Sequence, residues 1–222
     1  MSEGRLVIGT KRYSSWSLRG WLPVRLAGLE VSEEVIPLRQ PDSSVRIACV
    51  SPNGKVPFLE YRNVKIWDSL AIAEYCAELE PTLWPENREA RAMARSISAE
   101  MHSGFQGVRS VMPMNLGRIQ RPLKEPLSEA VLKDIARIDS IWTEARGRFG
   151  AGGDYLFGRD FTNADVAFAP IVARFLSYDV EVSDSSRNYI KAVRRHPLMA
   201  RWYEEAQREP SEWQVNAFET IE

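Results

Sequence analysis

Two stretches decide the fold of this chain: Asn53-Gly54-Lys55-Val56-Pro57-Phe58-Leu59-Glu60 and Trp67-Asp68-Ser69-Leu70-Ala71-Ile72-Ala73-Glu74-Tyr75. The first is typical of a turn, an X-Pro bond and a short strand. The second is typical of a strand end followed by an apolar helix, which Asp68 and Ser69 would cap. N–H groups left free at such a helix start bind anions, and a proline at a strand start leaves an edge for an extended ligand. Together they predict a pocket for a small peptide with a free carboxylate.

The first 80 residues mix strand and helix patterns around these two stretches. Arg62-Asn63 predicts a tight hairpin between two of the strands. The predicted strands cover residues 6–9, 31–38, 56–61 and 64–67, and the predicted helices cover 17–27, 42–49 and 69–78. The order β-α-β-α-β-β-α is that of a thioredoxin-like domain.

The remainder of the chain shows helical patterns and no convincing strand. Residues 81–87 contain two prolines, Pro81 and Pro85, and we interpret them as a linker. The predicted helices cover residues 88–112, 128–149, 163–178, 187–194 and 197–208. We therefore expect an α/β thioredoxin-like domain over residues 1–80 and an all-α helical bundle domain over residues 88–222.

A local helix-start signal is present at Thr162-Asn163-Ala164-Asp165. Thr162 and Asp165 have the spacing of a capping box, and Phe161 and Val166 have the spacing of a hydrophobic staple. These residues predict a helix with a fixed entry angle into the core, which is a structural role.

Composition excludes several functional classes. The 222 residues carry a formal net charge of -1, which gives no basic field for nucleic acid or for an anionic membrane. No apolar run approaches the roughly 20 residues that span a bilayer, and no signal-peptide core is apparent, so we expect a cytoplasmic protein. Cys49 and Cys76 match neither a disulfide framework nor a metal-ligand pattern, so we expect no metal.

The candidate reaction centre is Tyr13-Ser14-Ser15-Trp16-Ser17-Leu18-Arg19, between the first strand and the first helix. In thioredoxin-like domains this helix start presents free N–H groups and a positive dipole end to the reacting group. Redox members carry Cys-x-x-Cys here, and this chain has Ser14 and Ser17 instead. Dithiol chemistry is thereby excluded from the loop. A serine hydroxyl is suited to donate a hydrogen bond to a thiolate that a bound ligand supplies.

These segments resemble the cytosolic glutathione S-transferase family over nearly the whole chain. The loop from Ser14 to Arg19 is similar to that of the serine-type zeta and tau classes, although the zeta loop has cysteine where this chain has Trp16. The resemblance implies that Ser14 is the catalytic hydrogen-bond donor to the glutathione thiolate. Ser15 and Tyr13 remain alternatives, because other classes use a tyrosine near this place.

The same resemblance implies the glutathione contacts. Val56 would offer its backbone to the cysteinyl part next to a cis peptide bond to Pro57, while Asp68 and Ser69 would hold the γ-glutamyl amino and carboxylate groups. The other implied glutathione-binding residues are Trp16, Gln40 and Lys55, the last two near the glycyl carboxylate.

The acceptor pocket is the least determined part of the site. The residues expected to line it are Trp16, Met101, His102, Phe105 and Met112. We expect a homodimeric detoxification enzyme that conjugates glutathione to small apolar electrophiles. The alternatives are a glutathione-dependent isomerase or peroxidase, and an interaction module of the same fold without turnover.

Overall fold

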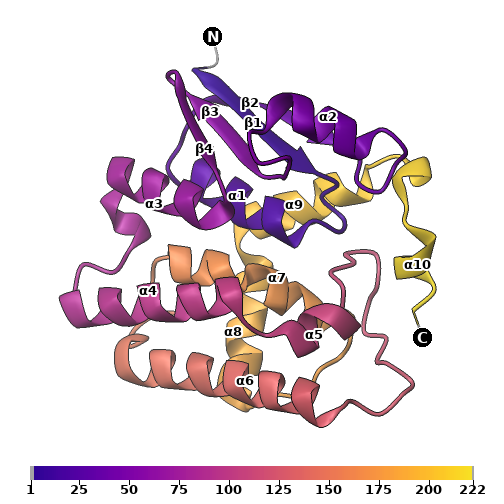
Figure 1. Ribbon diagram of the computed structural model, residues 1–222. Coiled ribbons are helices and arrows are strands. Elements are labelled where there is room, and N and C mark those ends of the chain that lie inside the picture. The colour runs from indigo at the N-terminus through magenta and orange to yellow at the C-terminus, as the bar shows by residue number, and fades with distance from the viewer. Residues whose placement is uncertain (1–2, 222) are drawn as a thin grey trace.

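The computed structural model describes residues 3–221. Its first part is a four-stranded sheet with the order β2-β1-β3-β4, in which β1 runs parallel to β2 and antiparallel to β3, and β3 runs antiparallel to β4 (Figure 1). The strands are β1 (Gly4–Gly9), β2 (Val31–Ile36), β3 (Phe58–Tyr61) and β4 (Val64–Trp67). The helices between and after them are α1 (Ser15–Leu26), α2 (Ser43–Val50) and α3 (Ser69–Leu79). The predicted β-α-β-α-β-β-α order and thioredoxin-like class are confirmed.

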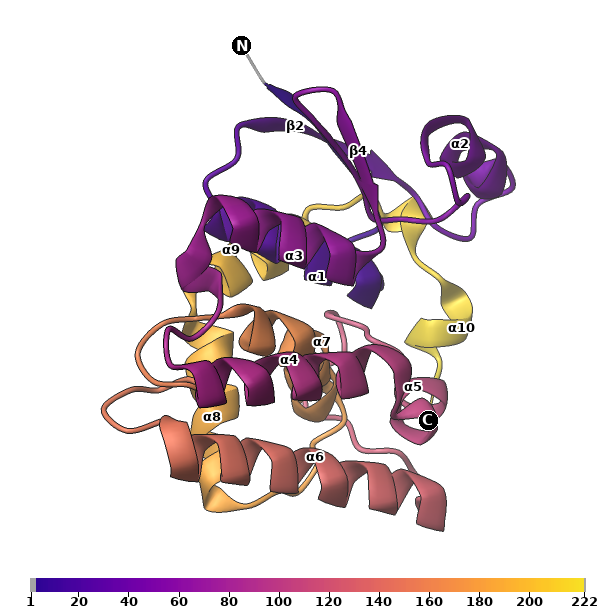
Figure 2. The same ribbon diagram turned by 60° about the vertical axis from the view of Figure 1, so that its left-hand side comes forward.

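Both faces of the sheet are buried, because consecutive apolar side chains of the strand β1 point to opposite faces. Leu6 and Ile8 of β1 pack into the large core that contains α1 and α3, whereas Val7 packs with Ile47 of α2 on the opposite face. The α1 and α3 helices therefore separate the sheet from the helices that follow (Figure 2).

The second part is helical, as predicted. Its elements are the 3-10 turn η1 (Pro81–Leu83), α4 (Arg88–Ser103), α5 (Gln106–Val111), α6 (Glu129–Phe149), α7 (Asn163–Ser177), α8 (Asp184–Arg195), α9 (Pro197–Gln207), the 3-10 turn η2 (Ser211–Trp213) and α10 (Asn216–Glu219). After β4, the only β structure in the described residues is an isolated bridge between Tyr155 and Gly158. None of the helices in residues 3–221 is long and apolar enough to cross a membrane.

The prediction of one helix over residues 88–112 is wrong. The α4 helix ends at Ser103, and Phe105 adopts a left-handed backbone with φ of 62° before α5 begins. The Arg109 guanidinium folds back and donates hydrogen bonds to the Gly104 carbonyl at 2.8 Å and to the Met101 carbonyl. These bonds satisfy carbonyls that a continuing helix would have used, so the apolar stripe continues across a break that its periodicity does not show.

The two parts meet along one continuous apolar core. The α1 helix packs against α7 and α9, and residues of both parts belong to the same buried cluster. We propose the division into residues 1–80 and 88–222 because the sheet and its helices end at Leu79 and η1 lies in the intervening segment.

The start of α7 confirms the predicted cap. The Asp165 carboxylate accepts hydrogen bonds from the N–H groups of Thr162 at 2.8 Å and of Leu156 at 3.1 Å. Phe161 and Val166, the staple residues, are both buried in the core. Asp165 thus ties the preceding loop to the first turn of α7.

Burial raises the pKa of Asp165 to about 6, although its hydrogen bonds oppose the shift. A raised carboxyl pKa contributes stability below the unfolded pKa of about 3.9, and that contribution is lost as the pH rises through 6. We therefore expect the free energy of unfolding of the wild type, relative to that of Asp165→Asn, to fall by about 2–3 kcal/mol between pH 4 and pH 7. Urea unfolding across this range checks the expectation, and parallel pH profiles for the two proteins would contradict it.

Candidate functional site

Ser14 begins the first helix of the sheet domain and lies in a short chain of hydrogen bonds. Its Oγ accepts the N–H of Ser17 at 3.2 Å and donates to the Ser17 Oγ at 2.8 Å, and that oxygen accepts the N–H of Gly9 at 2.8 Å. Ser14 therefore caps α1 with its oxygen, while its proton is held by a neighbouring hydroxyl. Rotation of the Ser14 hydroxyl would free this proton for a bound anion at the positive end of α1.

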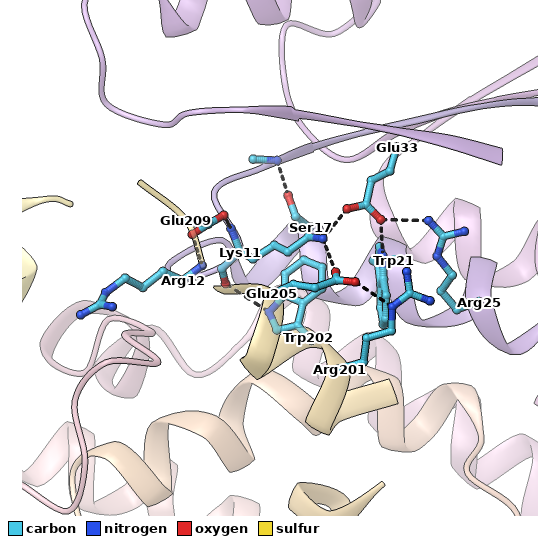
Figure 3. A network of polar contacts seen from close by, with 11 residues as sticks. Lys11, Arg12, Ser17, Trp21, Arg25, Glu33, Arg201, Trp202, Glu205 and Glu209 are labelled. Carbon is cyan, nitrogen blue, oxygen red and sulfur yellow. Dashed lines mark hydrogen bonds and ion pairs between the residues drawn. The ribbon is translucent and has the colours of Figure 1, made fainter. Parts of the chain in front are cut away.

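The loop that carries Ser14 is fixed by an ion-pair network that joins both ends of the chain (Figure 3). The Lys11 ammonium pairs with Glu33 of β2 and with Glu205 of α9, and its side chain is only 6 % exposed. It also lies 5.9 Å and 5.4 Å from the ring centroids of Trp21 and Trp202. The network holds the Ser14 loop of the first domain against the last long helix of the second.

A second anchor of this loop comes from the segment after α9. Glu209 accepts the backbone N–H groups of Lys11 and Arg12, the latter at 3.1 Å. Arg12 in turn pairs with Glu219 of α10 at 2.9 Å. The backbone at Lys11 and Arg12, which leads into Ser14, is thus held by residues about 200 positions later in the chain.

The alternative donors, Tyr13 and Ser15, have partners of their own. The Tyr13 hydroxyl donates to Glu219 and accepts the N–H of Val215 at 3.2 Å, so the C-terminal segment covers it. Burial, together with the bond to Glu219, raises the pKa of Tyr13 to about 12. Ser15 is buried, and its Oγ lies 3.4 Å from an Arg174 guanidinium nitrogen.

Tyr13→Phe is accordingly expected to leave the thiol chemistry of the site unchanged. The tyrosine hydroxyl is occupied by two partners and titrates far above neutrality, so its removal takes no proton from a bound thiolate. We expect the glutathione-dependent rate to stay within about twofold, while the loss of a hydrogen bond to a charged group costs roughly 1.5–3 kcal/mol of stability. Steady-state kinetics and urea unfolding measure the two effects, and a rate loss above tenfold would make Tyr13 the donor.

A cleft of about 380 Å³ opens beside this loop. It brings together seven of the residues that the sequence assigned to ligand binding, from α1, the loop before β3, the start of α3 and α4. The lining residues are Trp16, Asn53, Lys55, Val56, Pro57, Asp68, Ser69, His102 and Ser103. The peptide bond between Val56 and Pro57 is cis, as the sequence resemblance implied.

The start of α3 forms one wall of the cleft. Asp68 has a left-handed φ of 73°, and its carboxylate accepts the N–H of Leu70 at 2.8 Å, which caps the helix. The other carboxylate oxygen lies 3.5 Å from the His102 Nε2. Ser69 is buried, and its Oγ has no hydrogen-bond partner within the described part of the chain. A non-glycine residue in this backbone region marks strain of the kind that is common at ligand sites.

Several residues expected in the site lie elsewhere. Gln40 directs its amide to the Glu212 carbonyl at 3.4 Å, and Ser14 itself is not part of the cleft lining. Met101, Phe105 and Met112 are buried in the core and do not line this cleft either; Met112 borders a different cavity, near Leu132 and Tyr178. Of the expected acceptor-pocket residues, the structure brings together only Trp16 and His102 here.

Three arginines surround Trp16 and Ser15, and the sequence analysis did not single out Arg109 or Arg174. The guanidinium carbons of Arg19 and Arg109 lie 5.2 Å and 4.9 Å from the Trp16 ring centroid, and Arg174 reaches Ser15. The sequence feature that could have indicated Arg174 is its position as a single charged residue within the apolar run of α7.

Within residues 3–221, a nearby carboxylate favours the charge of only one of the three arginines: Asp134 lies near Arg109. Their hydrogen-bond partners within residues 3–221 are carbonyl and hydroxyl oxygens. Burial, together with the charges of Arg109 and Arg174, holds the pKa of Arg19 well below its usual range. Burial and the charge of Arg109 lower the pKa of Arg174 to about 9. The region beside the Ser14 loop is therefore strongly cationic and favours an anionic ligand.

No cluster of three or more potential metal ligands occurs among the described residues. The cleft itself is lined by the start of α3 and by Lys55 and His102. The three guanidinium groups do not line it and lie instead around Trp16 and Ser15.

The structure defines the class of protein as one with a thioredoxin-like sheet joined to a helical bundle. A hydroxyl lies at the start of its first helix, and a cis proline lies at the cleft beside the Ser14 loop. Residues 13–79 match the glutathione S-transferase N-terminal domain and residues 121–205 match the glutathione S-transferase C-terminal domain. The chain belongs to the glutathione S-transferase family.

Individual relatives match the chain at low sequence identity. Maleylacetoacetate isomerase from Rattus norvegicus is 26% identical over 82% of this chain and 84% of its own length, and a probable maleylacetoacetate isomerase from Caenorhabditis elegans is 24% identical over 82% and 85%. Among solved structures, a glutathione transferase homologue from Burkholderia with bound glutathione has a TM-score of 0.69 at 22% identity, covering 93% of this chain and 99% of its own. An unclassified glutathione S-transferase from Bombyx mori has a TM-score of 0.73 at 17% identity over 100% of both chains.

Proposed function

We propose that this protein activates the thiol of glutathione with Ser14 and directs the thiolate to an electrophile that carries a carboxylate. The observation that carries the proposal is the cleft that joins Val56, Ser69 and Trp16 next to the Ser14-capped start of α1. Glutathione bound in some solved relatives supports glutathione as the co-substrate.

The energy required for thiol activation matches what the site offers. A free cysteine thiol titrates near pH 8.5, and lowering this pKa by about two units requires roughly 2.7 kcal/mol of preferential binding to the thiolate. A hydrogen bond to a charged group contributes about 1.5–3 kcal/mol, and a helix N-terminus about 0.3–1 kcal/mol. The Ser14 hydroxyl would supply the hydrogen bond, and the start of α1 would supply the contribution of the helix N-terminus. Serine acts here as a donor and not as a nucleophile.

The arginines favour one class of electrophile over the other. The expectation from sequence was a small apolar acceptor, but Arg19, Arg109 and Arg174 place positive charge around Trp16 and Ser15. A carboxylate on the acceptor would compensate that charge, whereas an apolar acceptor would leave it buried and unpaired. The maleylacetoacetate isomerases among the relatives also favour an acceptor with a carboxylate, because their name denotes an acidic substrate.

Isomerisation is the second candidate, and the same thiolate serves it. Addition of the thiolate to the double bond of a cis-enone forms a carbon–sulfur bond and an enolate. Rotation about the resulting single bond and expulsion of the thiolate return glutathione and leave the trans isomer. The reaction needs no leaving group, oxidant or metal. In conjugation, a proton from water neutralises the enolate before the thiolate can leave, and the thioether is the final product.

A pair of matched acceptors tests the charge requirement. We expect a cis-enone that bears a carboxylate to react with kcat/KM at least about tenfold above that of its methyl ester, since each 1.4 kcal/mol of differential binding gives a factor of ten. Product analysis separates the trans isomer from the glutathione adduct, and an organic hydroperoxide serves as the third substrate. Preference for the ester would restore the apolar acceptor class.

Glutathione binding and thiol ionisation, measured without an acceptor, distinguish the enzyme from an interaction module. We expect calorimetric binding below millimolar concentration together with a thiolate absorbance band at a pH where free glutathione is still protonated. The absence of both would favour the non-catalytic module. We further propose a homodimer across α3 and α4, which light scattering on the purified protein tests, and a cytoplasmic location.

A further inference from the structure

A second cavity, separate from the cleft, lies where the segment between α5 and α6 (the α5–α6 loop, residues 112–128) meets α7, α8 and α9. Its volume is about 220 Å³, and no residue that lines it also lines the cleft. Cavities of about 300–1,000 Å³ hold drug-sized ligands, so this smaller one suits a molecule of one or two rings.

The loop that forms part of this cavity is held in a fixed conformation. The Ser177 Oγ donates to the Asn115 carbonyl at 3.0 Å, and the Arg121 N–H donates to the Ser177 carbonyl at 2.9 Å. The Arg118 Nε closes the loop by donating to the Arg121 carbonyl at 2.8 Å. Between them, Gln120 has a left-handed φ of 42°, a strained conformation that persists only where its surroundings impose it. The cavity is therefore formed before any ligand binds.

Part of the cavity lining is apolar and reaches the solvent. Leu116 is buried, Leu176 is half-buried, and Ile119 is 75 % exposed. A single exposed apolar side chain is ordinary on a protein surface, but this one borders a cavity. A ligand that fills the cavity would remove Ile119 from water, and the burial of its apolar surface would favour binding.

The cavity also contains a cation without a counter-ion. The Arg194 guanidinium lies flat against the Tyr203 ring, with its central carbon 3.8 Å from the ring centroid. It makes no hydrogen bond or ion pair with any described residue, and no acidic residue lines the cavity. The acidic residues of α9, Glu204 and Glu205, pair with other cations. Stacking leaves the in-plane N–H groups of a guanidinium free to bind a carboxylate.

Further polar groups of the lining can donate to an anion. Tyr203 is only 9 % exposed, and its hydroxyl makes no hydrogen bond within residues 3–221. Burial raises the pKa of Tyr203 to about 12, so the hydroxyl keeps its proton. The side-chain amide of Gln207 is likewise unpaired in the described chain. The second cation of the lining, Arg118, already donates to three backbone carbonyls, which leaves Arg194 as the free charge.

We propose that this cavity binds a small aromatic carboxylate, with its ring against Leu116, Leu176 and Ile119 and its carboxylate on the Arg194 guanidinium. An apolar wall beside one unpaired cation fits a ligand with an apolar body and a single anionic end. The limited volume favours one or two rings over a long aliphatic chain. The site does not depend on glutathione, because no residue of the cleft takes part in it.

A ligand in this cavity would also steady the C-terminal segment. The α5–α6 loop lies between α7 and α10 (Figure 1), and Asn115 donates to the Phe218 carbonyl at 3.2 Å. Arg121 donates to the Glu219 carbonyl at 2.9 Å, and the Glu219 carboxylate accepts the Tyr13 hydroxyl. We therefore expect the ligand to slow amide hydrogen exchange in both the loop and α10. Unchanged exchange in both would contradict the proposed position of the ligand.

Naphthoate, added without glutathione, tests the cavity. We expect calorimetry to show one site with a dissociation constant below about 1 mM, and binding at least about tenfold weaker for the neutral naphthamide. Arg194→Gln removes the free charge and should weaken naphthoate binding at least about tenfold. The matched control is Arg195→Gln, which removes an adjacent exposed arginine outside the cavity and should keep the affinity within about twofold.

Glutathione distinguishes this cavity from the cleft. We expect the affinity for naphthoate to be the same with and without saturating glutathione, because the two sites share no residue. Competition between the two ligands, or equal naphthoate affinity in the wild type and Arg194→Gln, would overturn the proposal. Naphthoate binding is expected even if the protein binds no glutathione, so failure of the proposed function does not decide this test.

Diffraction locates the ligand even where Arg194→Gln fails to fold. Wild-type crystals soaked in a brominated naphthoate should show an anomalous bromine peak among the apolar residues of the cavity. The carboxylate should lie within hydrogen-bond distance of the Arg194 guanidinium. A bromine peak in the cleft alone, or no peak at all, would contradict the site.

Discussion

Ser14→Ala is expected to lower the glutathione-dependent kcat/KM about ten- to one-hundred-fold near neutral pH. The hydroxyl offers the thiolate a hydrogen bond of about 1.5–3 kcal/mol, and each 1.36 kcal/mol corresponds to a factor of ten. The pKa of bound glutathione should rise toward that of the free thiol, so activity should recover in part at higher pH. Thiolate absorbance of bound glutathione, titrated across pH, measures this shift directly.

A matched variant separates this chemical role from the helix cap. Ser14 also caps α1, and loss of a cap costs about 1 kcal/mol of stability. Ser14→Thr keeps a hydroxyl for both roles and should retain most of the activity, whereas Ser15→Ala should leave the thiol pKa unchanged. A full thiolate signal in Ser14→Ala, or its loss in Ser15→Ala, would transfer the donor role to Ser15.

Lys11→Met is expected to destabilise the protein by about 3 kcal/mol and to loosen the Ser14 loop. The ammonium lies between Glu33 and Glu205 with 6 % of its side chain exposed, and removing one partner of a buried ion pair typically costs about 3–5 kcal/mol. The lower end applies because Glu33 keeps Arg25 and Glu205 keeps Arg201. Methionine preserves the apolar stem between Trp21 and Trp202. Urea unfolding measures the loss.

The pH dependence of this loss provides an internal check. Burial by itself would raise the pKa of Glu33 and of Glu205, but the hydrogen bonds from Lys11 and the other partners outweigh it and lower both. Their stabilisation is therefore present above the unfolded pKa of about 4.3 and is lost as the pH falls through the lowered folded values. The difference between wild type and Lys11→Met should shrink in acid.

The control for this second prediction is an exposed ion pair. Lys133 bonds Glu129 one helical turn away, and Lys133→Ala should change stability by less than about 0.5 kcal/mol. Equal losses in Lys133→Ala and Lys11→Met, or a loss below 1 kcal/mol in the latter, would show that the network in Figure 3 does not hold the two domains together.

The sequence determined the features that depend on near neighbours. The hairpin at Arg62-Asn63, the succession of strands and helices along the first 80 residues and the Asp165 cap follow from turn chemistry and side-chain periodicity within a few residues. The loop at Ser14 is a motif of similar length, whereas the cis bond at Pro57 was expected from the family resemblance that such motifs carry. Local patterns therefore carry the fold class and most of the cleft.

The tertiary structure decided what depends on distant partners. Arg174 reaches Met112 and Ser15, which are 62 and 159 residues away, and Tyr13 is closed off by Glu219, 206 residues further on. The break after Ser103 depends on Arg109 folding back onto carbonyls, which an apolar stripe does not encode. The positive charge around Trp16 and Ser15 thus arises only when α1, α5 and α7 pack together, because the charges that interact are neighbours in space and not along the chain.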